Sequence, residues 1–404
     1  MKILHTADWH LGKQLHKYSL EEDHRLFLDW LAQTILEHRI DLLLVSGDVF
    51  DTANPSNQAL AQYYGFLKKL IGTGCHVVVT GGNHDSPGVL NAPRELLRFL
   101  DIKVVGSALE NIQDELLHIE TPQGEIVIAA VPYLREADLR RSVAGEGYDD
   151  RLSAMRLGIR RHYEQLADGK AARFAGLPSV AMGHLYVNGA TVSESERDIH
   201  VVGGEAAFAA EFFPPGFDYI ALGHIHKPQR IQNSDFIRYS GSPVPLSFSE
   251  REDNKYVLVL TLENNHIGQV EALPVPVFRE LRSFTGGLDE VEAALKAYIF
   301  TNQLPSYVEV HVSEPFADPQ KELYFTYLMR EFDHVPFQII KPRLSFENRT
   351  KGADELFMTG TSILDLTPQE VFQKRIASEN LDDETQGLLA EAFEELWREV
   401  GEQN

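Results

Sequence analysis

The sequence has little of what secreted or membrane-bound proteins need. Its 404 residues include a single cysteine, Cys75, which excludes an intramolecular disulfide and a cysteine-rich zinc site. The first residues have no basic flank followed by a long apolar run, so we do not expect a signal peptide. The longest apolar stretches, such as 126–131, have the length of a strand and are too short to cross a membrane. These absences predict a soluble, cytoplasmic protein without a membrane partner.

Positive charge is also scarce. The chain has 37 Lys and Arg residues against 60 Asp and Glu residues, which gives a net charge of −23. Such a balance argues against nucleic-acid binding by bulk electrostatics alone. The negative charge does not exclude a nucleic-acid enzyme that uses metal ions, local arginine clusters or a basic partner. An apolar content of 43% and a charged content of 24% are typical of a globular chain, and the length predicts two or three domains.

The first two thirds of the chain repeat one pattern, a short apolar run followed by a turn that carries Asp, Asn or His. Continuous runs rich in Val, Ile and Leu are typical of strands buried on both faces. Between the first three runs, apolar residues at helical spacing predict helices over 21–37 and 57–70. This alternation predicts an α/β core whose ligands bind beyond the carboxyl ends of the strands. The strand-like runs are 2–4, 41–45, 76–79, 179–182 and 219–222.

A second sheet is expected from strand-turn-strand patterns over 124–131 and 236–262. Within the latter, 238–240, 243–248 and 255–262 are the expected strands.

A Pro-bounded connector at 274–276 marks a change of organisation. Beyond it, helices over 288–300 and 320–331 and strands over 307–312 and 337–341 predict a small α+β unit. We therefore expect a main domain over 1–270, a small α+β domain over 275–344, and a linker with C-terminal helices over 345–404.

The C-terminal part is acidic, and its last predicted helix carries one apolar stripe. An apolar stripe on such a helix either packs against its own domain or binds a partner. The stripe consists of Leu389, Phe393, Leu396, Trp397 and Val400.

Seven candidate metal ligands follow five of the strand-like runs. Residues two apart, as in Asp8 and His10 or His224 and His226, point to the same side if the strand continues. At one sheet edge, the set offers two carboxylates, one amide oxygen and four imidazoles, enough for two divalent metals that share a carboxylate. Nitrogen and oxygen donors without a thiolate suit Mn²⁺ and permit Fe, Zn or Mg. The candidates are Asp8, His10, Asp48, Asn83, His184, His224 and His226.

Two such metals, roughly 3.5–4 Å apart, can hold a phosphate and turn a bridging water into a nucleophile. Each short motif alone is a weak signal, whereas all five in this order are specific. The motifs are Asp8-x-His10, Gly47-Asp48, Gly82-Asn83-His84-Asp85, Gly183-His184 and Gly223-His224-x-His226.

Together these motifs resemble the calcineurin-like metallophosphoesterase superfamily. The longer segments 3–12, 46–52, 223–229 and 239–248 resemble its bacterial DNA-repair nucleases, and the likeness covers nearly the whole chain. The resemblance implies an α/β fold, a four-layer α/β/β/α sandwich with a small α+β capping domain and C-terminal helices. It also implies a manganese-dependent nuclease that acts in double-strand-break repair and recombination. The implied activities are 3′→5′ exonuclease cleavage of double-strand DNA ends and endonuclease cleavage that opens hairpins or ends.

The same resemblance implies partners and residue roles. The chain would be a homodimer within a heterotetramer that includes a coiled-coil ATPase of the SMC type, docked by the C-terminal helices. One metal would be held by Asp8, His10, Asp48 and His226. The other would be held by Asp48, Asn83, His184 and His224, with Asp48 bridging. His84 would protonate the leaving 3′ oxygen or stabilise the transition state, with Asp85 orienting its imidazole.

Three interpretations stay open beside these roles. His84 is alternatively a hydrogen-bonding residue that fixes a ligand. Archaeal and eukaryotic relatives carry a histidine at the position of Asp51, which we interpret as the N-cap of the following helix or a turn residue. An arginine-rich stretch contacts DNA phosphates or forms a solvated helix face paired with Glu136, Asp138, Asp149 and Asp150. The stretch contains Arg135, Arg140, Arg141, Arg151, Arg156, Arg160 and Arg161.

Two other functions compete with the nuclease. The first is a dimetal phosphomonoesterase acting on a small molecule or a phosphoprotein. Purple acid phosphatases need a Tyr ligand after their Gly-Asp, which Phe50 and Asp51 do not supply, and the added domain exceeds what a minimal phosphatase needs. The second is a binding scaffold with a vestigial site, which predicts missing ligands, and none of the seven is missing.

Overall fold

A computed structural model describes residues 1–140, 146–193, 196, 208–332, 337–346, 372, 389, 392 and 393. The chain divides into two compact units. The first contains Met1–Ser283, Ile299–Glu309 and Val335–Lys341, and the second contains Phe284–Tyr298, Val310–His334 and Pro342–Asn404. Most of the predicted linker and acidic C-terminal helices, Trp397 included, lie outside the described residues.

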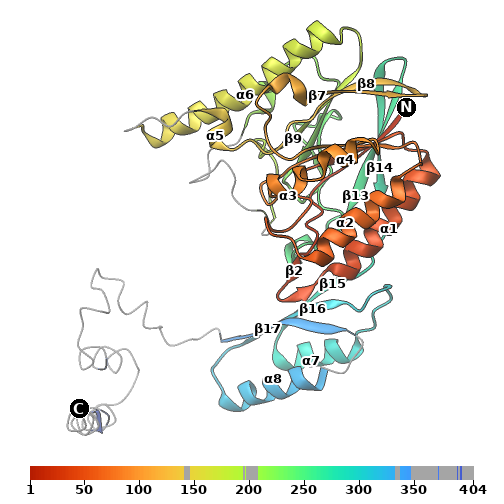
Figure 1. Ribbon diagram of the computed structural model, residues 1–404. Coiled ribbons are helices and arrows are strands. Elements are labelled where there is room, and N and C mark those ends of the chain that lie inside the picture. Colours follow the sequence, from red (N-terminus) through yellow and green to blue (C-terminus); the bar gives the residue numbers. More distant parts are fainter. Residues whose placement is uncertain are drawn as a thin grey trace. The chain divides into compact units, whose positions relative to one another are not determined.

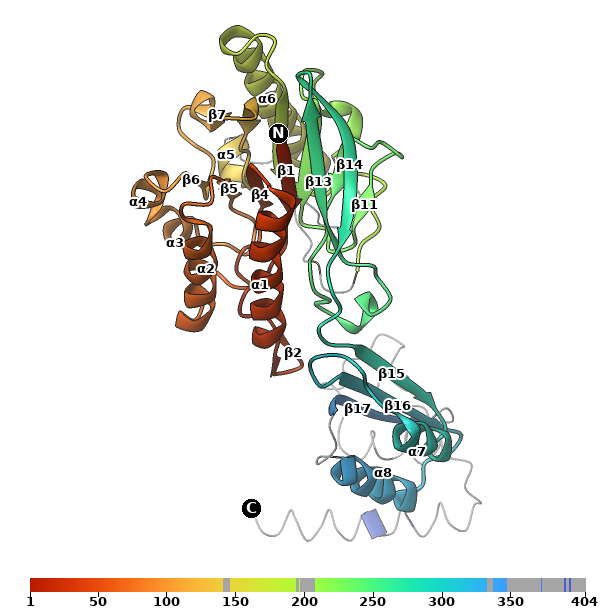
Figure 2. The same cartoon turned by 90° about the vertical axis from the view of Figure 1, so that its right-hand side faces the viewer.

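The first unit is built on a six-stranded sheet of order β14-β13-β1-β4-β5-β6 (Figure 1). Its central strands are parallel, as their continuous apolar runs predict, and β13 adds to β1 in the antiparallel direction. Figure 2 shows the β13–β14 hairpin beside β1. The strands are β1 (Lys2–Thr6), β4 (Leu42–Ser46), β5 (His76–Thr80), β6 (Ile102–Val105), β13 (Tyr256–Glu263) and β14 (His266–Pro274).

Helices α1 (Glu21–His38) and α2 (Asn57–Leu70) connect the first parallel strands and cover the outer face of this sheet. Helix α2 begins where the Ser56 hydroxyl accepts a hydrogen bond from the Ala59 N–H at 3.1 Å. The apolar faces of both helices pack on Trp9, whose indole lies edge-on to rings of each helix. The short helices α3 (Pro87–Asn91) and α4 (Arg94–Arg98) lie between β5 and β6.

A second six-stranded sheet of order β11-β12-β10-β9-β8-β7 packs face to face on the first. Ile3, Leu44 and Val78 from one sheet share a buried cluster with Ile128 and Met182 from the other. The strands are β7 (Leu116–Thr121), β8 (Gly124–Ala129), β9 (Ser179–His184), β10 (Tyr219–Gly223), β11 (Gln229–Arg230) and β12 (Ile237–Tyr239).

The 26-residue helix α6 (Tyr148–Arg173) covers the outer face of this second sheet through Ile159, Tyr163 and Leu166. Two helical layers therefore enclose two sheets, and the predicted α/β/β/α sandwich is confirmed. The short helix α5 (Glu136–Leu139) precedes α6. The small strands β2 (Gln14–Leu15) and β3 (Tyr18–Ser19) pair after β1.

A three-stranded sheet of order β15-β16-β17 follows, formed by β15 (Leu281–Gly286), β16 (Tyr307–Glu314) and β17 (Gln338–Phe346). Helices α7 (Leu288–Ala297) and α8 (Pro319–Glu331) belong to the second unit. Helix α7 starts where the Glu290 carboxylate accepts the Gly287 N–H at 3.1 Å, and α8 starts at the Asp318 cap.

One predicted strand is absent from the structure. Residues 243–248 were expected to be a strand but form an irregular segment that ends in a 3₁₀ turn at Phe248–Glu250. Pro243 and Pro245 lack the N–H that a strand ladder needs, which explains the difference. Helix α6 was expected only as the solvated helix face of the arginine-rich stretch, because its sequence is polar on most sides, with few buried positions. Among the helices that the structure describes, none has the length and apolar character needed to span a bilayer.

Candidate metal centre

The predicted ligands come from the carboxyl ends of strands in both sheets. Asp8 and His10 follow β1, Asp48 follows β4, and Asn83 follows β5. In the second sheet, His184 ends β9, while His224 and His226 follow β10. All are buried except Asn83, which is half-buried. Because parallel strands end at one edge, residues far apart in the sequence converge there.

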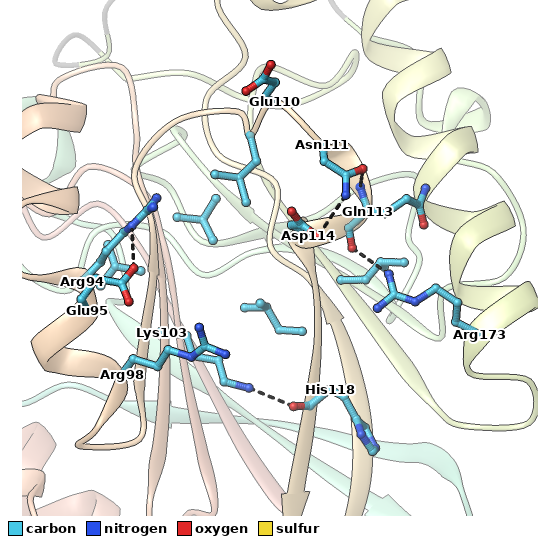
Figure 3. Close-up of a pocket in the computed structure, with 15 residues that line it drawn as sticks. Arg94, Glu95, Arg98, Lys103, Glu110, Asn111, Gln113, Asp114, His118 and Arg173 are labelled. Carbon is cyan, nitrogen blue, oxygen red and sulfur yellow. Dashed lines mark hydrogen bonds and ion pairs between the residues drawn. The ribbon is translucent and has the colours of Figure 1, made fainter.

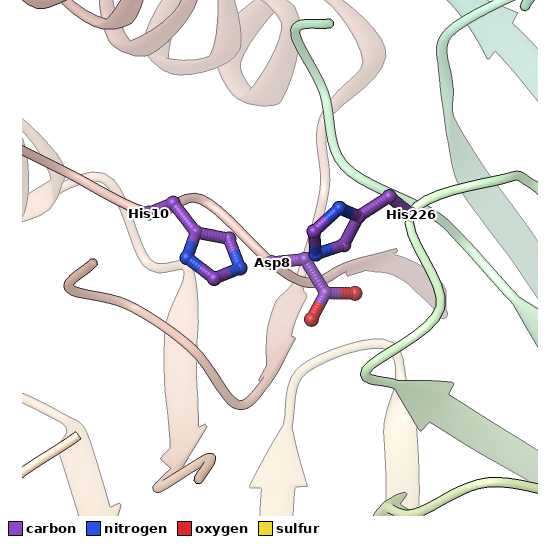
Figure 4. A group of neighbouring side chains, drawn as sticks. All are labelled: Asp8, His10 and His226. Atoms are coloured by element: carbon purple, nitrogen blue, oxygen red, sulfur yellow. The ribbon is translucent and has the colours of Figure 1, made fainter. Parts of the chain in front are cut away.

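The side chains form two groups that meet at Asp48. Ligand atoms of Asp8, His10 and His226 lie within 4.8 Å of one another, and Figure 4 shows these side chains side by side. Ligand atoms of Asp48, His184 and His224 form a second group by the same limit.

Asp48 connects the two groups. Its Oδ2 lies 3.5 Å from His10 Nε2 and 3.3 Å from His184 Nε2. His184 Nε2 is also 2.9 Å from Asn83 Oδ1. The carboxylate of Asp48 therefore lies where a ligand shared by two cations is needed.

The backbone is strained at this edge. Asp8, His10, Asp48 and His224 adopt positive φ angles of 54°, 48°, 50° and 99°. Left-handed backbone is unfavourable for residues with a Cβ and is concentrated at functional sites. At the neighbouring Gly82, an added Cβ would lie 2.1 Å from Asp48 Oδ1, so no larger residue fits there without a shift.

Buried charge dominates the electrostatics of the site. Burial raises the pKa of Asp8 to about 7. Although burial opposes it, interactions with His184 hold the pKa of Asp48 well below its usual range. Burial also disfavours the charged form of His184, but the nearby Asp48 carboxylate raises the pKa of this histidine to about 9. Two carboxylates in one buried cluster need compensating positive charge.

The donor set fits divalent cations. His10 Nε2 is buried, and no hydrogen-bond partner for it exists among the described residues. Such an unpartnered nitrogen between carboxylates is the atom that a metal ion would satisfy. Imidazole nitrogens with carboxylate and amide oxygens are ligands for divalent transition metals.

His84 lies at the same edge, with a ring nitrogen within 4.8 Å of ligand atoms of His10 and Asp48. Its Nδ1 donates to the backbone carbonyl of Asp51 at 2.7 Å. The prediction that Asp85 orients this ring is therefore wrong, since a backbone carbonyl does so.

The carboxylate of Asp85 binds the backbone of two turns and does not orient His84. Its carboxylate accepts backbone N–H groups of Gly82, Phe50 and Val49 at 2.8, 2.9 and 3.1 Å. These bonds tie the turn after β4 to the turn after β5.

Asp51 is not the N-cap of the following helix, because Ser56 caps α2. Its side chain instead contacts His10 Nδ1 at 3.2 Å and Lys13 Nζ at 3.1 Å. A comparable carboxylate that the sequence analysis did not single out, Glu250, contacts His226 Nδ1 at 3.3 Å. No short motif marks Glu250, although it closely follows the segment 239–248 that resembles DNA-repair nucleases.

In the arginine-rich stretch, three side chains are paired with acidic residues. Arg140 binds Glu136 and Glu146, and Arg151 also binds Glu136. Arg160 binds Glu164 one turn further along α6 at 2.7 Å. These four ion pairs match the interpretation of a face paired with acidic residues, although the Arg140 side chain is only 10% exposed. Arg141 lies outside the described residues.

A cavity of about 1020 Å³ lies elsewhere, and the described residues that line it include none of the seven ligand candidates. Figure 3 shows Arg94 and Arg98 of α4 on one side and Arg173 of α6 on the other. With Lys103, four cationic side chains line the cavity against the three carboxylates of Glu95, Glu110 and Asp114, so its charge is largely balanced.

Comparisons with known proteins agree with this geometry. Residues 1–228 match the family model of calcineurin-like phosphoesterases, and residues 277–380 match that of the type 5 capsule protein repressor C-terminal domain. The SbcD subunit of the nuclease SbcCD from Escherichia coli (strain K12) is 37% identical over 400 residues, covering 97% of each chain.

Shorter matches have similar identity. The SbcD subunit of Rhodobacter capsulatus is 37% identical over 73% of this chain and 75% of the relative. That of Bacillus subtilis (strain 168) is 38% identical over 64% of this chain and 66% of the relative.

Proposed function

This chain belongs to the calcineurin-like phosphoesterases and, within them, to the SbcD subunits of SbcCD nucleases, and from this membership we propose that it cleaves phosphodiester bonds in DNA. It is an enzyme of the phosphodiesterase type. The proposed substrates are double-strand ends and hairpins, cut in 3′→5′ exonuclease and end-opening endonuclease reactions during repair and recombination. The observation that carries the proposal is the pair of ligand groups that meet at Asp48.

In the proposed site, Asp8, His10, Asp48 and His226 hold one divalent metal ion. Asp48, Asn83, His184 and His224 hold the other, and Asp48 is shared. We propose manganese for both, since borderline nitrogen and oxygen ligands without thiolate suit it. When bound, two such ions polarise the phosphodiester and lower the pKa of a bound water.

The chain's own residues supply orientation and a proton. His84 places its Nδ1 on the Asp51 carbonyl, and we propose that its Nε2 acts on the substrate. As the water oxygen bonds to phosphorus and the bond from phosphorus to the 3′ oxygen breaks, protonated His84 Nε2 would donate its proton to that oxygen. The proton lost by the water goes to solvent, from which His84 is protonated again. Asp85 acts indirectly, by holding the turns that carry Asp48 and Asn83.

The partners are also proposals. The name SbcCD of the relatives points to an assembly with SbcC, which we propose is an ATPase of the SMC type. In our proposal, residues 1–270 are the nuclease domain, 275–344 form the small α+β capping domain, and 345–404 dock the ATPase in a heterotetramer with two copies of this chain. A cytoplasmic location follows if the substrate is chromosomal DNA.

The decisive experiment uses the purified full-length chain with Mn²⁺. We expect chelator-sensitive degradation of linear duplex DNA and opening of a DNA hairpin, with little hydrolysis of nitrophenyl phosphate. The Asp48→Asn variant serves as a control and should lose both DNA activities, because Asp48 is the ligand that we propose both metal ions share. Efficient hydrolysis of the monoester without DNA cleavage would favour a phosphomonoesterase instead.

A further inference from the structure

The group formed by Asp8, His10 and His226 (the Asp8 group) contains two histidines. Each of them has a carboxylate next to its ring nitrogen Nδ1. Asp51 Oδ1 lies 3.2 Å from His10 Nδ1, and Glu250 Oε1 lies 3.3 Å from His226 Nδ1. An ionised carboxylate only accepts hydrogen bonds, so each Nδ1 carries the proton. The lone pair of each ring is then on Nε2, the nitrogen with which the ring would bind a metal ion.

Each of these carboxylates is itself held by a lysine. Lys13 Nζ lies 3.1 Å from Asp51 Oδ1, and Lys255 Nζ lies 2.6 Å from Glu250 Oε2. The Asp51 side chain is 16% exposed, whereas that of Glu250 is fully buried. Both sides of this candidate metal position therefore have the same lysine–carboxylate–histidine order.

Residues next to Glu250 also fix the backbone of His226. Lys255 Nζ donates to the His226 carbonyl at 3.0 Å, and the Ser242 N–H donates to the same oxygen at 3.1 Å. Glu250 Oε2 accepts the Ser242 hydroxyl and the Leu246 N–H, both at 3.2 Å. Through these hydrogen bonds, the irregular segment before β13 fixes the position of the loop that carries His226.

The second ligand group differs at His184. The Nδ1 of His184 lies 3.1 Å from the backbone carbonyl of Ser46, a neutral acceptor. A carboxylate behind a ligating imidazole raises its basicity more than a neutral carbonyl does, and it fixes the ring more firmly. Apart from the shared Asp48, the proposed ligand set with Asp8 has a second carboxylate, where the other set has the neutral Asn83.

We propose that Asp51 and Glu250 are positioning residues that strengthen metal binding selectively at the position formed by Asp8, His10 and His226. This inference rests on the proposed function, because it concerns the affinity of one of the two proposed metal positions. The two carboxylates act through the histidines and do not touch the metal or the DNA.

The test measures metal binding by the full-length chain after metal removal. Glu250→Gln and Asp51→Asn keep the side-chain shape and remove the charge, and Glu252→Gln is the control because its carboxylate is 83% exposed. Titration calorimetry with Mn²⁺ should show two binding steps in the wild-type chain. We expect each positioning variant to weaken one step about 10–100-fold and to leave the other step and the control unchanged.

A spectroscopic readout separates this role from general destabilisation. In the cobalt-substituted protein, the visible absorption of one metal ion should change in both positioning variants. Cleavage by these variants should recover at raised Mn²⁺ concentration. Unchanged affinities, or equal weakening of both steps, would overturn the inference.

The outcomes also distinguish this inference from the proposed function. If the wild-type chain binds no Mn²⁺ and leaves DNA intact, the proposed function is wrong. If it binds two ions and cleaves DNA while both variants bind like wild type, only the roles of Asp51 and Glu250 are wrong. Since Asp51 and Glu250 lie on different segments, failure of one variant to fold leaves the other as the test.

Discussion

The Nδ1 atom of His84 lies 2.7 Å from the backbone carbonyl oxygen of Asp51, while the side chain of that aspartate holds His10. One residue therefore orients both a proposed metal ligand and the proposed proton donor. Because the hydrogen bond to His84 comes from the backbone, it persists whatever the side chain at position 51 is. The two functions can be separated by mutation.

We predict that His84→Ala retains both metal ions but loses cleavage. Removal of a general acid lowers turnover by about 10²–10⁴-fold, and the ligand atoms of Asp8, Asp48 and His184 stay in place. Metal content by mass spectrometry and cleavage of linear duplex DNA measure the two effects. The exposed His266 on β14 offers a control, His266→Ala, which should behave like wild type. A parallel fall of metal content and activity would make His84 a ligand.

Asp85→Asn should act mainly on stability. The carboxylate of Asp85 accepts three backbone N–H groups in a buried position, and an amide offers one oxygen and an unwanted donor. A buried N–H left without its acceptor costs about 1–3 kcal/mol in the free energy of unfolding. Urea unfolding of the metal-free protein measures this loss. If stability were unchanged while turnover collapsed, Asp85 would have a direct part in the reaction.

Metal removal should destabilise the nuclease domain. Asp8 and Asp48 are buried in one cluster, so without a cation their charges are incompletely compensated. A ligand that binds only the folded state stabilises it by about 2.7 kcal/mol at a free concentration about 100 times its Kd. The melting temperature should therefore rise with Mn²⁺ concentration in wild type. Asp48→Asn should show a much smaller rise, and an equal rise would indicate that the ions bind elsewhere.

Much of the proposed ligand set was predictable because polar turn residues follow buried apolar strands. Asp8, Asp48 and Asn83 each stand next to a Val-, Leu- or Ile-rich run, and parallel strands bring their ends together. The helix over Asn57–Leu70 was predictable because its apolar face and its start are both local signals.

The residues behind the ligands were not predictable in the same way. Glu250 contacts His226 across 24 positions of sequence, and Asp51 contacts His10 across 41. These contacts depend on how irregular segments pack, for which short motifs carry no signal. The role assigned to Asp85 was wrong because sequence adjacency to His84 does not determine which side chain faces its ring.

Deletion of residues 367–404 should abolish association with the ATPase while sparing Mn²⁺ binding. The seven proposed ligands lie between positions 8 and 226, so the deletion leaves them intact. Co-purification of the two proteins and calorimetry of the truncated chain measure the two properties. Unchanged co-purification would show that docking uses another part of the chain.

The thiol of Cys75 should be inert in the native protein. Cys75 directly precedes β5, is buried, and donates to the His76 carbonyl with a sulfur–oxygen distance of 3.4 Å. Burial raises its pKa to about 12, so at pH 8 the thiol stays protonated, and the protonated form is not the nucleophile. We expect slow labelling by a disulfide reagent under native conditions and rapid labelling of one thiol per chain in urea.

Mn²⁺ should slow native labelling further, because Asn83 follows the same strand and metal binding there opposes its opening. Rapid labelling of the native, metal-loaded chain at pH 7 would contradict both the burial of Cys75 and this coupling.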